Sequence, residues 1–129
     1  KTLGLDDLQR VHAMKTGALI KAAILIPAAI AGTDSDDTEV LKAFADDLGL
    51  AFQIRDDILD VDASTEQLGK SAGKDAAQSK STYPALLGLD GAKTLLTQLA
   101  ERMAARLRRF DDRADGLRNL AEFAVNRRN

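Results

Sequence analysis

The chain has 129 residues, of which 45% are hydrophobic and 29% are charged, a composition typical of globular proteins, and residues 1–129 are at most one domain. Its net charge of −2 gives no general attraction to nucleic acid, and the absence of cysteine excludes disulfides and thiolate metal sites. The longest apolar stretch, 22–31, is interrupted by Pro27 and is too short to span a bilayer. No secretory signal pattern is visible. The absence of cysteine fits a cytosolic protein, so we expect a cytoplasmic location.

The first half of the sequence predicts two long helices. Apolar residues recur at helical spacing from about residue 6 to residue 31. The turn that follows contains Asp34 and Ser35, either of which can cap a second helix that continues to about residue 61. A break of this second helix at Gly49 is an alternative that the pattern leaves open.

The second half begins with a predicted loop over 62–82, which is rich in Gly, Ser, Ala and Lys and has no apolar periodicity. Thr82 or Ser81 is expected to cap a short helix over 83–88. A longer helix is then expected over 90–109, where leucines recur at helical spacing.

The last helix is expected to follow a polar break at 110–115, with Asp115 as its cap. One face of this helix carries the apolar side chains, which are Leu117, Leu120, Phe123 and Ala124. The basic pair at 127–128 carries no specific signal. Since no stretch alternates with a period of two, the sequence predicts an all-α bundle of long helices.

The run 52–60 combines three carboxylates and an amide with apolar neighbours. At about 100° per residue, the side chains of Gln53, Asp56, Asp57 and Asp60 fall within an arc of roughly 100°. Apolar side chains occupy most of the remaining circumference, which is the pattern of a buried helix. Buried carboxylates need a positive partner, and three acids with one amide suit a hard cation such as Mg²⁺. A solvated acidic stripe on an amphipathic helix is the alternative.

Two groups of basic and hydroxyl side chains could bind an anion. His12, Lys15 and Thr16 lie on one predicted helix face, although such residues are most often plain surface residues. Lys70 and Lys80 lie in the Gly/Ser-rich loop, a composition that suits phosphate binding but is also that of a solvated linker. The loop does not have the spacing of a Walker motif. Together with the acidic run, these groups supply what is needed to hold a diphosphate on an apolar organic group.

Four elements, in this order, resemble the trans-isoprenyl diphosphate synthases, or polyprenyl synthetases, and most closely the bacterial farnesyl diphosphate synthases (geranyltranstransferases). They are His12-x-x-Lys15-Thr16-Gly17, Phe52-Gln53-x-x-Asp56-Asp57-x-x-Asp60, Gly69-Lys70 and Lys80-Ser81-Thr82-Tyr83-Pro84. The resemblance implies a helical bundle around an apolar cavity. It also implies a homodimer that condenses an allylic diphosphate with isopentenyl diphosphate, using Mg²⁺ or Mn²⁺.

The resemblance also implies roles for individual residues. Asp56, Asp57 and Asp60 match the second aspartate-rich motif and are the expected metal ligands, with Asp56 the best candidate for direct contact. The remaining matches are to groups that contact substrate: Lys15, Thr16 and Gln53 near the allylic diphosphate, Lys70 and Lys80 as diphosphate-binding lysines, and Phe52 near the isopentenyl unit. Lys15, Thr16, Lys70 and Lys80 are also the expected catalytic residues.

The family's first aspartate-rich motif is missing from the sequence, so we expect the C-terminal portion of such an enzyme, inactive by itself. Two other hypotheses remain. One is a non-catalytic helical fragment or interaction module that needs its missing N-terminal half. The other is a related terpene cyclase, which the lysines and the His12-to-Gly17 element disfavour.

Overall fold

The computed structural model describes residues 17–25, 27–28, 31–66 and 82–128. The named elements are α2 (Ser35–Glu66), α4 (Tyr83–Leu107), the short 3₁₀ helix η1 (Asp112–Ala114) and α5 (Asp115–Asn126). Residues 17–25 and 27–28 are also helical. The described ranges contain no strand, so the predicted all-α class is confirmed.

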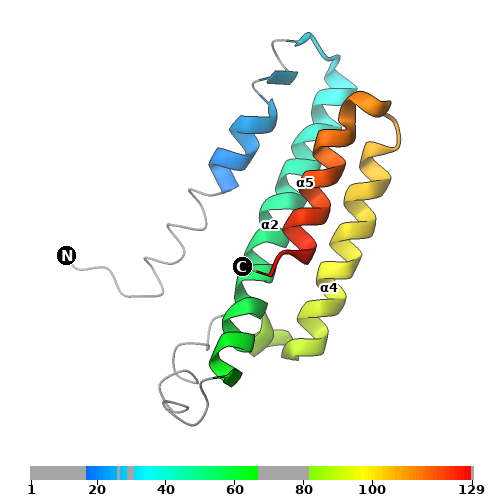
Figure 1. Ribbon diagram of the computed structural model, residues 1–129. Coiled ribbons are helices and arrows are strands. Elements are labelled where there is room, and N and C mark those ends of the chain that lie inside the picture. The colour runs from blue at the N-terminus through cyan, green and yellow to red at the C-terminus, as the bar shows by residue number, and fades with distance from the viewer. Residues whose placement is uncertain (1–16, 26, 29–30, 67–81, 129) are drawn as a thin grey trace, which may run out of the picture.

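Helices α2, α4 and α5 lie side by side and form an up-down-up bundle (Figure 1). Helix α4 runs opposite to α2, and α5 turns back along both of them. The core between the three helices is built from aliphatic side chains, one Phe and one Met. Its largest fully buried members are Phe44, Leu48, Ile54, Ile58, Leu99, Met103 and Leu107.

Helix α2 begins as predicted, because the backbone N–H of Asp37 donates to Oδ1 of Asp34 at 2.7 Å. The helix then continues without a break through Gly49 to Glu66, for 32 residues. The predicted loop was therefore wrong at its beginning, over 62–66. The physical reason is that one polar turn can extend a helix already anchored by its buried face, even without apolar periodicity.

Helix α4 begins at Tyr83 with Thr82 as its cap, since the Thr82 hydroxyl accepts a hydrogen bond from the backbone N–H of Ala85 at 3.3 Å. Gly88 has φ 78° and ψ 160°, which breaks the helical backbone and kinks α4. The predicted division into a short helix and a longer one is thus confirmed. The positive φ explains why glycine occupies this position.

The beginning of α5 differs from the prediction. Asp115 is the first helical residue rather than the cap, and it pairs with Arg118, whose Nη1 lies 2.8 Å from Asp115 Oδ1. Arg118 also donates to the carbonyls of Leu107 and Phe110, each at 2.9 Å, and so satisfies acceptors at the end of α4.

The buried face of α5 agrees with the prediction in part. Ala124 is buried and Leu117 is partly buried against the core, as predicted. Leu120 is 38% exposed and Phe123 is 55% exposed, and Ala121 is buried instead. Small side chains on the inner face allow α5 to lie close to α2 and α4, which leaves the larger apolar side chains outside.

A buried ion cluster joins α2 to α4. Asp47 is 5% exposed, and its carboxylate accepts hydrogen bonds from Arg102 at 2.8 Å and from Arg106 at 2.7 Å. A guanidinium matches a carboxylate with two parallel donors, which satisfies the buried charge. Asp46, the preceding residue, is exposed, and its ion-pair partner among the described residues is Lys21, at 3.3 Å.

Candidate functional site

The acidic run lies near the C-terminal end of α2, close to where α4 begins and where α5 ends. The three carboxylates differ in their surroundings. Asp57 is 7% exposed, whereas Asp56 and Asp60 are exposed. The expectation that the carboxylates lie inside the protein is correct for Asp57 and wrong for the other two. The reason is that the described helices pack on the side of α2 that carries Ile54 and Ile58, and leave Asp56 and Asp60 at the surface.

Asp57 links α2 to the beginning of α4. Its Oδ1 accepts a hydrogen bond from Nε2 of Gln53 at 3.0 Å, and its Oδ2 accepts one from the backbone N–H of Tyr83 at 3.1 Å. Tyr83 is the first residue of α4, so the carboxylate lies at a helix N-terminus, where negative charge is favoured. Desolvation nevertheless raises the pKa of Asp57 above its ordinary value, and the charge of Asp56 adds to this effect.

Asp56 pairs with Arg127, whose Nη2 contacts Asp56 Oδ1. The same guanidinium donates to the backbone carbonyl of Phe52 at 3.2 Å and lies over the Phe52 ring, 4.2 Å from its centroid. In return, Nε of Arg55 donates to the Arg127 carbonyl at 2.7 Å. One turn of α2 therefore holds both the side chain and the backbone of Arg127.

Asp60 lies one turn beyond Asp56 on the same side of α2, because residues four apart differ by roughly 40° around a helix. Partial desolvation raises the pKa of Asp60, and the negative charges of Asp56 and Asp57 raise it further. Because these neighbours destabilise the ionised form of Asp60, a cation bound nearby would stabilise it.

Two carboxylates of the acidic run could bind Mg²⁺, but the run does not supply all six ligands of the ion. The part of the chain that the structure describes holds no group of three His, Cys, Asp or Glu side chains arranged to share one ion. Mg²⁺ is commonly held by one or two carboxylates, with water and substrate phosphate completing its six ligands. Asp56 and Asp60 match that requirement, while both oxygens of Asp57 already accept hydrogen bonds.

Other predicted site residues lie outside the described residues, namely Lys15, Thr16, Lys70 and Lys80. Phe52 and Gln53 are described and lie in the same turn as the carboxylates. Sequence reasoning missed Arg127, which meets Asp56 across a separation of 71 residues. No local pattern could have found this contact, because it depends on where α5 ends in space.

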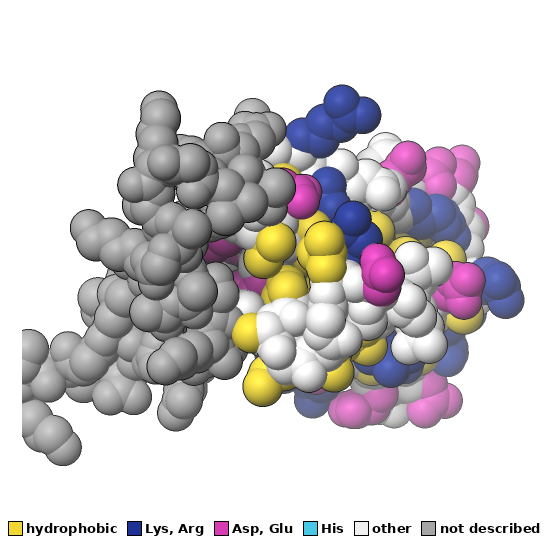
Figure 2. Space-filling view, turned by 90° about the horizontal axis from the view of Figure 1, so that it is seen from below, with side chains coloured by type: hydrophobic (Ala, Val, Ile, Leu, Met, Phe, Trp, Pro, Cys, Tyr) yellow, Lys and Arg dark blue, Asp and Glu magenta, His cyan; other side chains and the backbone are white. Residues whose placement is uncertain are grey.

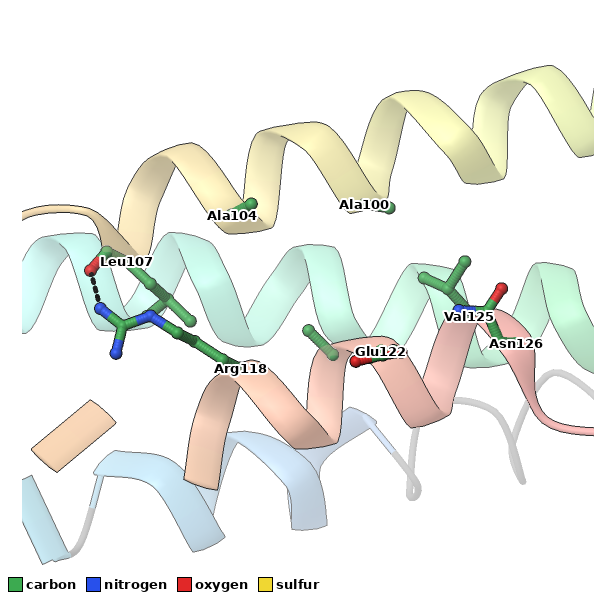
Figure 3. Close-up of a pocket in the computed structure, with 8 residues that line it drawn as sticks. Ala100, Ala104, Leu107, Arg118, Glu122, Val125 and Asn126 are labelled. Carbon is green, nitrogen blue, oxygen red and sulfur yellow. Dashed lines mark hydrogen bonds between the residues drawn. The ribbon is translucent and has the colours of Figure 1, made fainter. Parts of the chain in front are cut away.

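Two hollows of the described surface lie away from the acidic run. A cavity of about 300 Å³ lies between α4 and α5 and is walled by small and apolar side chains, among them Ala100, Ala104 and Val125 (Figure 3). A second one, of about 290 Å³, lies between Gly17 and Gly49. None of the predicted site residues lines either cavity.

The family model described as polyprenyl synthetase matches residues 1–115. The chain belongs to the polyprenyl synthetase family. Among its relatives, it is 42% identical to the farnesyl diphosphate synthase of Geobacillus stearothermophilus over 127 residues, which is 98% of this chain and 43% of the relative. It is 41% identical to the mitochondrial geranylgeranyl pyrophosphate synthase 10 of Arabidopsis thaliana, covering 98% of this chain and 37% of the relative. Relatives named for two different products thus have nearly the same identity to this chain.

A similar fold is found in the crystal structure of a candidate farnesyl-diphosphate synthase from Marinomonas sp. MED121. The TM-score is 0.71 and the sequence identity is 37%, with 98% of this chain and 42% of the other chain covered. The fold expected from the resemblance is therefore confirmed. The chain spans less than half the length of these relatives. No helix of the described ranges has the length and apolar character needed to cross a membrane.

Proposed function

We propose that this chain is part of a Mg²⁺-dependent trans-prenyltransferase of the farnesyl diphosphate synthase type, with Mn²⁺ as an alternative ion. The substrates would be an allylic diphosphate, either dimethylallyl or geranyl, and isopentenyl diphosphate, joined by ionisation, condensation and elimination. The observation that carries the proposal is the exposed pair Asp56 and Asp60, one helical turn apart, in a chain of the polyprenyl synthetase family. When bound, Mg²⁺ would neutralise charge on the departing diphosphate.

The three aspartates would have different roles. Asp56 and Asp60 would bind the metal, because their carboxylates lie at the surface on the same side of α2. Asp57 would chiefly hold the beginning of α4 in place through Tyr83, although each carboxylate oxygen has a second lone pair that a metal could use. Gln53 donates to Asp57 and so fixes the orientation of that carboxylate.

The diphosphate would be bound by residues outside the described ranges. Lys15, Thr16, Lys70 and Lys80 stay predictions in this role, since ammonium and hydroxyl groups are suitable donors to phosphate oxygens. Phe52, whose ring is half-buried next to Asp56, is proposed to contact the isopentenyl unit. Homodimerisation and a cytoplasmic location also stay proposals.

The coverage of the relatives favours a second statement about this chain by itself. Because it spans 43% of the Geobacillus relative, we propose that residues 1–129 alone bind a diphosphate weakly and do not turn over substrate. The two hypotheses are therefore compatible. The isolated chain would be a non-catalytic fragment, and the full-length protein would be the prenyltransferase.

The test is Asp56→Ala in the full-length protein. We expect turnover of geranyl and isopentenyl diphosphate to fall by about two orders of magnitude or more, the scale of losing a group that stabilises transition-state charge. The melting temperature is expected to fall because Arg127 loses its partner, but the protein stays folded at the assay temperature. Asp62→Ala is the matched control, since Asp62 is an exposed acid on the same helix outside the motif. Near-normal turnover of Asp56→Ala would refute the metal-ligand assignment.

A further inference from the structure

The guanidinium of Arg127 packs against one turn of α2. The proposed function assigns no role to this interaction. The Arg127 side chain is 8% exposed although the backbone after α5 is not helical. Its contacts include the carboxylate of Asp56, the carbonyl of Phe52 and the face of the Phe52 ring. A cation so desolvated is retained only when its charge and its donors are satisfied.

Arg127 and its neighbour Arg128 differ in burial. Arg128 is exposed, while the Arg127 backbone is held by the 2.7 Å hydrogen bond from Arg55. A planar guanidinium can donate to a carboxylate and a carbonyl at once and stack on an aromatic ring, which an ammonium cannot do equally well. The backbone at 127 thus lies across α2 where the red end of α5 meets the green half of α2 (Figure 1).

Oδ1 of Asp56 cannot pair with Arg127 and bind a divalent cation at the same time without bringing two positive charges close together. Arg127 Nη2 contacts Oδ1 of Asp56, which is the side chain proposed to bind Mg²⁺. A dication at that carboxylate would lie within a few ångströms of the guanidinium, and the like charges would repel. Without metal, the positive charge of Arg127 at Asp56 offsets part of the negative charge that Asp56 adds beside Asp57 and Asp60.

We propose that Arg127 is an internal counter-ion which occupies Asp56 in the metal-free protein and is displaced when a divalent cation binds. The inference rests on the proposed function, because it takes Asp56 as a metal ligand. Binding of metal to the acidic run and release of the chain after α5 are then one coupled equilibrium. The site has two states, one closed by Arg127 and one open to the cation.

The test measures Mn²⁺ affinity by electron paramagnetic resonance in the full-length protein, with Mn²⁺ alone and no substrate. Arg127→Gln removes the competing charge, so Mn²⁺ is expected to bind roughly two- to fivefold more tightly, the range set by a half-exposed ion pair. Arg128→Gln removes the same charge from the exposed neighbour and is expected to leave the affinity unchanged. Unchanged or weaker binding in Arg127→Gln, or equal tightening in Arg128→Gln, would overturn the proposal.

A second measurement covers the case in which Arg127→Gln disturbs the local fold. Phenylglyoxal labelling followed by peptide mass spectrometry reports whether Arg127 is accessible in the unaltered protein. Labelling of Arg127 is expected to increase severalfold on adding Mn²⁺, and also in Asp56→Asn without metal. Labelling that is insensitive to both would contradict displacement. If Asp56→Asn does not weaken Mn²⁺ binding, the metal assignment in the proposed function fails, whatever Arg127 does.

Discussion

At the scale of single residues, the three aspartates of one α2 segment have three different environments. Asp57 is buried and accepts two hydrogen bonds, Asp56 pairs with a guanidinium, and Asp60 is exposed with neighbouring negative charges. Their chemical identity is the same, so the difference comes from what faces each carboxylate. Sequence spacing could place all three on one arc of a helix but could not assign these environments.

We predict that Asp57→Asn stabilises the metal-free protein at neutral pH. Burial raises the pKa of Asp57 in the folded state above its unfolded value. The ionised carboxylate therefore opposes folding above the folded pKa, and this cost is relieved as the pH falls through the folded pKa toward the unfolded value. Asparagine removes the charge, can still accept from the Tyr83 N–H, and can donate to Gln53 once that amide flips.

Thermal unfolding in a chelator, over a range of pH, measures this effect. The melting temperature of Asp57→Asn is expected to exceed that of the unaltered protein at pH 7, and the two curves should converge in acid, where Asp57 is protonated. A variant that is less stable at pH 7, or an advantage that grows as the pH falls, would contradict the argument.

At the scale of elements, most beginnings and ends of the helices could be predicted because capping is local. Asp34 and Thr82 lie within three residues of the N–H groups they accept from. Two helix ends differed from the prediction: α2 continues to Glu66, and Asp115 is the first residue of α5 because Asp111 and η1 already make the turn. On the apolar face of α5, Leu117 and Ala124 pack inward as predicted, whereas Leu120 and Phe123 are exposed.

We predict that Gly88→Ala destabilises the protein by about 1–3 kcal/mol, the cost of a non-glycine residue in a sparsely populated backbone region. Gly88 has a positive φ, at 78°, and the Cβ would meet nothing within 4 Å, so the cost is conformational rather than steric crowding by neighbours. The comparison is Gly116→Ala in α5, which has open space and no positive φ, and is expected to gain up to about 1 kcal/mol. Urea unfolding of both variants measures the difference, and equal effects would contradict the assigned cause.

At the scale of the whole molecule, α2 is the central element, because α4, α5 and the segment around 17–28 all pack on it. Apolar side chains nonetheless remain at the surface, and Figure 2 shows some of them at one end of the bundle. Leu86, at the beginning of α4, is 71% exposed, and so is Leu19. Exposed apolar groups of this size commonly mark surfaces for further packing, which agrees with the partial coverage of the longer relatives.

We predict that Asp47→Ala lowers the free energy of unfolding by about 2–3 kcal/mol, because the buried carboxylate holds two arginines of α4 against α2. Asp46→Ala removes an exposed pair with Lys21 and is expected to cost less than about 1 kcal/mol. Chemical unfolding of the two single variants compares a buried and an exposed pair at adjacent positions. Equal losses would show that Asp47 does not join the helices as described.

The sequence by itself determined the helical class, two candidate residues for each cap of α2 and α4, the division of the helical segment after 88, and the resemblance to the family. Each of these depends on residues a few positions apart or on ordered motifs. Only the tertiary structure decided that Asp57 is buried while Asp56 and Asp60 are exposed, and that Arg127 pairs with Asp56. These outcomes depend on groups 26 and 71 residues away, which packing rather than local spacing brings together.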